Sequence, residues 1–207
     1  MILFRLFAVY IILSLPILEV IAQSNSTLQK AFQNSYKEES RKNYTKAIGY
    51  IKPYYDDENY EVSLRMGWLY YLSKDYRSSI NYYNKAVKIL PSAIEAKFAL
   101  IKPLVFLKDL DKVMEQYKGV LKIDPQNKQA NYWTGVLTYN KKDYNGAIKY
   151  FTKVVEAYPF DYDGNHMMAW ALLLSNRKEA AITYFERALL IKPGDSSSID
   201  GLSKASK

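Results

Sequence analysis

Four prolines recur at a fixed interval, and this spacing constrains the fold more than any other feature of the sequence. Each lies 34 residues from the next: Pro91, Pro125, Pro159 and Pro193. Three aspartates keep the same interval: Asp75, Asp109 and Asp143. A fixed period of this length marks a repeat array, in which one small supersecondary unit is copied and stacked. The sequence therefore predicts a stack of similar units.

Each unit has the pattern of two amphipathic helices joined by a short turn. In residues 60–93, apolar side chains recur at helical spacing on two successive segments, and the period is not the alternation of a strand. Lys74 and Asp75 separate the two segments. An Asp side chain at this place can accept hydrogen bonds from the free N–H groups of a starting helix. The pattern favours an all-α fold.

A particular order of large, small and aromatic residues runs through each unit. In the first unit the order is Met66, Gly67, Tyr70, Ser79, Tyr83, Ala86 and Pro91. This order closely resembles the tetratricopeptide repeat, in which the small residues let two helices approach closely. Four copies in register extend the resemblance over residues 60–195. The resemblance implies an α-solenoid of stacked antiparallel helix pairs in a right-handed superhelix.

The repeat frame also predicts how the whole chain is organised. An atypical first helix pair is expected because terminal repeats often depart from the pattern, and Pro53 should end its second helix early. The predicted segments are an export signal at 1–22, a degenerate helix pair at 23–59, repeats at 60–93, 94–127, 128–161 and 162–195, of which 94–127 is degenerate, and a short C-terminal cap or tail at 196–207.

Residues 1–22 have the pattern of an export signal. One basic residue, Arg5, is followed by an apolar run over residues 6–18, and small side chains precede a cut after Ala22. The alternative is an uncleaved membrane anchor formed by residues 6–22, which Pro16 and Glu19 disfavour. We therefore expect a periplasmic or secreted protein, with membrane contact through the N-terminus only if this segment is retained.

The sequence offers little for catalysis. There is no cysteine, which excludes disulfides, thiolate metal sites and a lipid-modified signal cut before Cys. His166 is the single histidine, and no phosphate loop, carboxylate pair or nucleophile motif is apparent. The sequence therefore predicts a protein that is not an enzyme and that needs no cofactor or metal.

Recognition of another molecule is the function that the resemblance implies. In tetratricopeptide repeats the first helix of each pair lines a concave inner face. The side chains expected on that face are Phe32, Tyr36, Leu64, Trp68, Tyr71, Phe98, Lys102, Tyr132, Tyr139, His166 and Trp170. Aromatic groups with polar tips suit a groove that binds a protein or an extended peptide. Tyr71, Tyr132 and Tyr139 fit simple packing equally well.

The formal net charge is +8 and the isoelectric point is about 9.3. Lysines such as Lys85 and Lys149 are scattered over the predicted second helices and form no dense run, so no nucleic-acid partner is expected. The basic charge suggests an alternative function. The protein would then be a structural spacer or envelope-assembly subunit that contacts anionic surfaces through its outer face.

Overall fold

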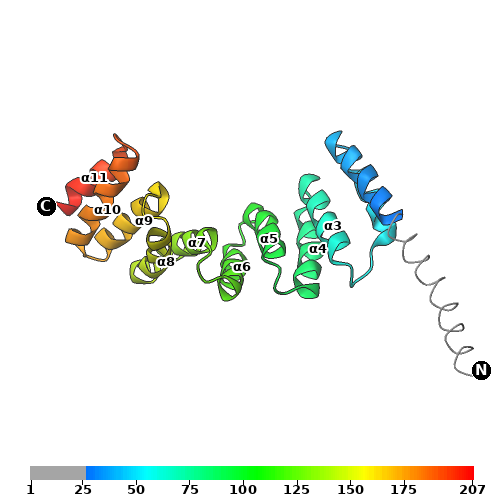
Figure 1. Ribbon diagram of the computed structural model, residues 1–207, viewed down its shortest axis with the longest axis horizontal. Helices are drawn as coiled ribbons and strands as arrows, with labels where there is room; N and C mark the ends of the chain where they lie inside the picture. Colours follow the sequence, from blue (N-terminus) through cyan, green and yellow to red (C-terminus); the bar gives the residue numbers. More distant parts are fainter. Residues whose placement is uncertain (1–26) are drawn as a thin grey trace, which may run out of the picture. The chain divides into compact units, whose positions relative to one another are not determined.

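A computed structural model describes residues 27–207, and this part of the chain is helical with no strand. The predicted export signal lies outside the described residues. The described chain divides after Pro91 into two compact units, residues 27–91 and 92–207, and each is described by itself (Figure 1). Within each unit, adjacent helices pack in antiparallel pairs. The predicted all-α fold of stacked helix pairs is confirmed.

The first unit contains two helix pairs. Residues 27–40 form its first described helix, called helix 27–40 below, which precedes α2 (Tyr44–Ile51). The second pair is α3 (Tyr60–Leu72) and α4 (Tyr76–Ile89). As predicted, Pro53 ends α2 early, since it lies in a short 3-10 helix at Lys52–Tyr54. A buried apolar core joins the pairs: Ala31, Ala47, Ile51, Val62, Met66 and Leu69.

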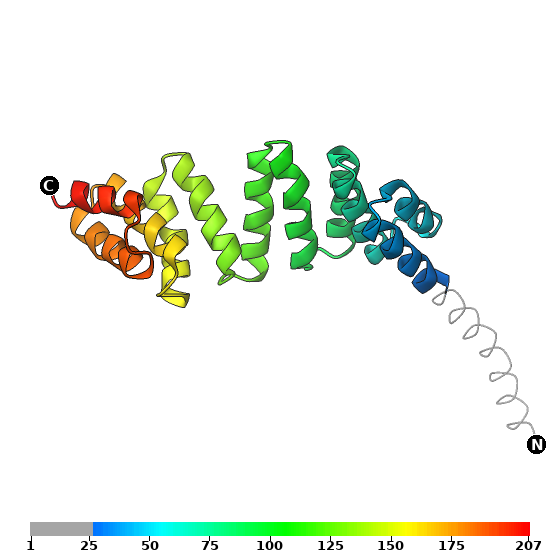
Figure 2. The same ribbon diagram turned by 90° about the horizontal axis from the view of Figure 1, so that it is seen from above.

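The second unit contains three helix pairs and a closing helix. Figure 2 shows these helices following one another along the unit, each packed on the next. Their bounds are α5 (Ile94–Phe106), α6 (Leu110–Ile123), α7 (Lys128–Asn140), α8 (Tyr144–Ala157), α9 (Tyr162–Leu174), α10 (Lys178–Ile191) and α11 (Ser196–Ala205). α3, α5, α7, α9 and α11 each begin 34 residues after the one before.

The periodic aspartates begin the second helix of three pairs, as the sequence predicted. Asp75, Asp109 and Asp143 each accept a hydrogen bond from the backbone N–H three residues later. The residue before each one is a lysine with positive φ, between 58° and 66°. This left-handed conformation is unfavourable for a residue with a Cβ atom, yet it forms the tight turn between the two helices.

The first helices of the pairs have caps of their own. Asn127, Asp161 and Asp195 lie two residues after a repeat proline, and each accepts from a backbone N–H at the helix start. Ser92 and Glu95 have the spacing of a capping box, but α5 begins at Ile94, and its N-cap Ala93 provides no side-chain hydrogen bond.

Glycines allow the two helices of a pair to touch. A Cβ atom added at Gly67 would lie 2.5 Å from the ring of Tyr83, and one added at Gly135 would lie 2.6 Å from the ring of Phe151. Both rings are buried beneath the facing helix. The small residues of the repeat pattern are thus the sites where an aromatic ring of the second helix packs against the backbone of the first.

Candidate functional site

In the first unit, the predicted inner-face residues lie on helix 27–40 and α3. The rings of Phe32 and Tyr36 have centroids 6.3 Å apart, and those of Trp68 and Tyr71 stack at 5.6 Å. Leu64 lies one turn before Trp68 on α3 and is partly buried. We call these five residues the Tyr36–Trp68 surface. Tyr36 is its most accessible member, with 55% of the residue exposed.

A buried arginine fixes one side of this surface. Arg65 on α3 is only 5% exposed, and its guanidinium donates to the Ser35 hydroxyl at 2.9 and 3.1 Å and to the Glu39 carboxylate. The same guanidinium lies 3.9 Å from the centroid of the Tyr36 ring. A cation over an aromatic face is attractive, so this contact favours the observed orientation of the exposed ring.

Glu39 also connects the two aromatic groups. One carboxylate oxygen of Glu39 accepts from Arg65, and the other accepts from the indole N–H of Trp68 at 2.8 Å. Residues 36 and 39 are one turn apart on helix 27–40, and residues 65 and 68 are one turn apart on α3. The polar contacts therefore bring the predicted residues of both helices onto one side of the unit.

In the second unit, four predicted residues lie on α5 and α7. Phe98 packs edge-on against Tyr117 of α6 at 6.2 Å, and Lys102 is exposed. Tyr132 and Tyr139 pack against the buried core of the unit. Burial raises the pKa of Tyr132 to about 12, so its phenol stays neutral. These two tyrosines have the packing role that the sequence left open.

The remaining two predicted residues, His166 and Trp170, lie against α11. The His166 Nδ1 atom is 2.9 Å from the Ser198 hydroxyl, and the Trp170 indole N–H donates to the Ser197 hydroxyl at 3.1 Å. Lys204 of the same helix lies 5.6 Å from the Trp170 ring centroid. The closing helix of the chain therefore occupies the place beside α9 where a further first helix would stack.

Charges around His166 partly offset one another. Burial lowers the pKa of His166, while the carboxylates of Asp195 and Asp163 act to raise it. Asp195 caps α11, and the backbone N–H of Ser198 holds the pKa of this carboxyl well below its usual range. His166 is therefore neutral near pH 7 and is held between α9 and α11 by polar contacts.

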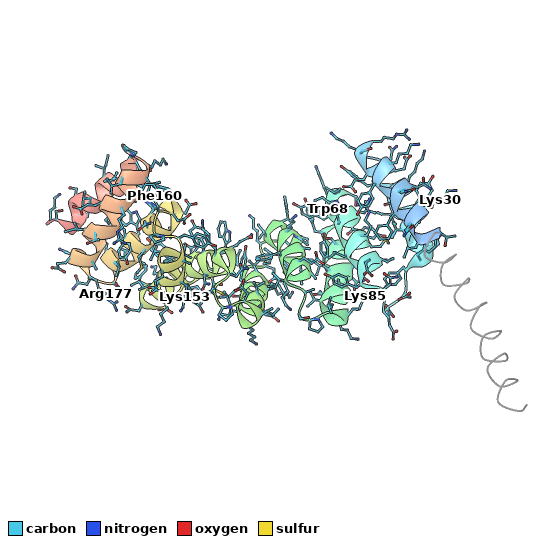
Figure 3. The ribbon with its side chains drawn as sticks, viewed as in Figure 1. Lys30, Trp68, Lys85, Lys153, Phe160 and Arg177 are labelled. Carbon is cyan, nitrogen blue, oxygen red and sulfur yellow. The ribbon has the colours of Figure 1, made fainter. Side chains whose placement is uncertain are left out.

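The second helices carry the basic groups of the alternative function. Lys85 on α4 is engaged within its own unit, since its ammonium donates to Tyr55 and to Asp57, the latter at 2.7 Å. Lys85 and Trp68 lie toward opposite edges of the first unit (Figure 3). Lys149 and Lys153 on α8 are exposed. The charge of Lys85 is thus partly neutralised, whereas Lys149 and Lys153 remain accessible.

Two features are absent from residues 27–207. This part of the chain has no group of three His, Asp or Glu side chains that could hold a metal ion. Its helices are also each too short or too polar to cross a bilayer.

Sequence patterns of two known families match the chain. The one described as "Tetratricopeptide repeat" matches residues 140–204. The one described as "Uncharacterized protein conserved in bacteria (DUF2225)" matches residues 21–167, which is more than half of the chain. The chain belongs to this second family and is a tetratricopeptide repeat protein.

Solved structures resemble this tetratricopeptide repeat protein over most of its length. The MamA protein superposes with a TM-score of 0.68 at 18% identity, covering 81% of this chain and 93% of MamA. A tetratricopeptide repeat protein from Parabacteroides merdae gives 0.71 at 16% identity, covering 87% and 72% of the two chains. YrrB, described as having an unusual peptide-binding site, gives 0.69 at 14%, covering 89% and 96%. At these identities the likeness shows the fold alone.

A curated relative matches part of the repeat protein. Anaphase-promoting complex subunit 3 of Schizosaccharomyces pombe is 28% identical over 87 residues, which are 42% of this chain. The match spans only 13% of that subunit's length.

Sequence reasoning did not find the polar groups that order the Tyr36–Trp68 surface. Arg65 and Glu39 are 26 residues apart in different helix pairs, and neither belongs to the repeat pattern. The one available signal was the charged residue Arg65 itself, which lies directly before the core position Met66. A buried charge requires a partner, so Arg65 could have been singled out as a bridging residue.

Proposed function

We propose that this repeat protein is an exported, non-catalytic scaffold that binds a protein or peptide partner through the Tyr36–Trp68 surface. The observation that carries the proposal is the Tyr36 ring, which is largely exposed and packs against the buried guanidinium of Arg65. An aromatic side chain that is already ordered loses little conformational freedom when it binds. Large aromatic groups with a polar tip are also the commonest anchors of protein interfaces.

The predicted inner-face residues of the second unit are less suited to binding a partner. Phe98 and Lys102 on α5 remain accessible enough to contact a partner, whereas Tyr132 and Tyr139 pack on the core. His166 and Trp170 contact α11, so a partner would have to displace that helix to reach them. We therefore assign the main binding role to the first unit.

Export and the absence of catalysis are parts of the same proposal. Export rests on the basic and apolar pattern of residues 1–22. The non-catalytic role is supported by the tetratricopeptide repeat fold, which typically serves as an interaction scaffold, and by YrrB, which has this fold and a peptide-binding site. The binding surface is the most specific claim of the three.

Site-specific crosslinking tests the proposal. A photoreactive amino acid replaces Tyr36 in the full chain, expressed in its native cell, and the matched control places the same amino acid at Phe160, another exposed aromatic residue. We expect a discrete protein adduct from position 36 that is lost when Trp68→Ala is added. Adducts of equal yield at both positions, or none at position 36, would show that this surface binds no partner.

A further inference from the structure

The outer face of the first helix pair is basic. Lys30 and Lys37 are seven residues apart on helix 27–40, so they lie on one side of it, and Arg41 follows directly after its end; all three are exposed. Lys42, in the turn before α2, and Lys46, in its first turn, are exposed as well. We call these five residues the basic end face.

Two surface hollows connect the helices of this face. One, of about 310 Å³, is lined by Lys30 and Asn34 of helix 27–40 and by Tyr50 of α2. The other, of about 600 Å³, is lined by Lys42 and Lys46 together with Lys74 from the turn between α3 and α4. The first hollow therefore lies between helix 27–40 and α2, and the second places Lys74 beside Lys42 and Lys46.

The acidic residues of the same helix pair neutralise this surface only at Arg41, which pairs with Glu38. Residues 27–52 contain six Lys and Arg residues but only two acidic ones. Glu38 is buried and accepts from Asn43 at 2.9 Å and from Arg41 at 3.0 Å, while Glu39 is bonded to Arg65 and Trp68. No carboxylate of the described chain forms an ion pair with the four lysines of the face.

We propose that the basic end face docks on the surface of an anionic lipid bilayer. Charge complementarity supports this occupant, because clustered lysines bind acidic headgroups at close range. The exposed ring of Tyr50 is amphipathic, as side chains at a membrane–water interface commonly are.

Amine footprinting of the full chain tests this docking. The protein is mixed with vesicles of phosphatidylcholine alone or of phosphatidylcholine with phosphatidylglycerol, and lysine acetylation is read by mass spectrometry. We expect labelling of Lys30, Lys37, Lys42 and Lys46 to fall about threefold or more with the anionic vesicles only, and to recover at high salt. Lys149 and Lys153 serve as internal controls whose labelling stays constant.

A matched pair of variants separates docking from general charge. Lys37→Glu with Lys42→Glu and Lys46→Glu should abolish the dependence on lipid composition, whereas Lys149→Glu with Lys153→Glu and Lys178→Glu changes the charge equally and should preserve it. Three results would overturn the proposal. The first is no protection by either vesicle, and the second is equal protection by both. The third is protection that rises with protein concentration without lipid, which would indicate a second copy of the chain.

Discussion

The indole N–H of Trp68 donates a 2.8 Å hydrogen bond to Glu39, and the other carboxylate oxygen of Glu39 accepts from the buried guanidinium of Arg65. These contacts join α3 to helix 27–40. Removing one partner of such a buried pair leaves the other charge uncompensated, which is more unfavourable than losing an exposed ion pair. The stability of the first unit should therefore depend on this bridge.

We expect Arg65→Ala to lower the free energy of unfolding by about 3 kcal/mol, because Ser35 and Glu39 lose their donor. Urea unfolding followed by far-ultraviolet circular dichroism measures the change. Arg77→Ala, at an exposed arginine on α4, is the matched control and should stay within about 0.5 kcal/mol of the parent. Equal effects of the two substitutions would contradict the bridging role of Arg65.

Two glycines within helices should respond oppositely to alanine. Gly67→Ala should destabilise by about 1–3 kcal/mol because its Cβ atom would overlap the Tyr83 ring. Gly49→Ala on α2 meets no atom within 4 Å and should stabilise by roughly 0.5–1 kcal/mol through helix propensity. Thermal melts of both variants give the comparison, and a stabilised Gly67→Ala protein would mean that the two helices are farther apart than described.

The turn lysines with positive φ offer a stabilising substitution. Lys142 has φ of 63° and is exposed, and Asn176 holds the equivalent place one repeat later. Asn adopts the left-handed conformation more readily than Lys, so Lys142→Asn should stabilise by roughly 0.5–1 kcal/mol. A rise in the melting temperature checks this, and an unchanged or lower value would show that the turn is not strained.

Stability should fall as the pH drops below about 6.5, the ordinary pKa of His, because burial lowers the pKa of His166. The unfolded chain then binds a proton that the folded chain resists, and the loss continues until the pH passes the folded pKa. The charged groups around His166 are Asp163, Asp195 and Lys192.

The comparison of urea midpoints at about pH 7.5 and pH 5.5 measures this loss, and His166→Gln is the control because glutamine does not titrate. The parent chain should lose more stability between the two pH values than the variant does. Identical losses would show that folding does not lower the pKa of His166.

The repeat period predicted the helical frame because its signals are local. Proline spacing, the capping aspartates Asp75, Asp109 and Asp143, and the ring-facing Gly67 all act within one unit. The caps at Asn127 and Asp161 could have been predicted from their place two residues after each proline. Only Ala93, the N-cap of α5, breaks that rule, because alanine has no side-chain atom that can accept a hydrogen bond.

The candidate surface was harder to predict because its order depends on long-range polar contacts. Repeat position alone made Trp68 and Trp170 equivalent, yet Trp68 bonds to Glu39 of the preceding first helix and Trp170 bonds to Ser197 of the following one. The partner of each indole lies outside its own repeat. The pattern of a single repeat therefore could not distinguish the accessible surface from the one that α11 covers.

The most direct test of partner binding uses the indole N–H resonances of the three tryptophans, Trp68, Trp133 and Trp170, in a ¹⁵N-labelled chain. The probe is a peptide from the protein crosslinked at position 36, and Tyr36→Ala is the control that should weaken its binding. The predicted result is a saturable shift of the Trp68 resonance while those of Trp133 and Trp170 stay in place. A peptide that shifts only Trp133 or Trp170 would contradict the assignment of the binding surface to helix 27–40 and α3.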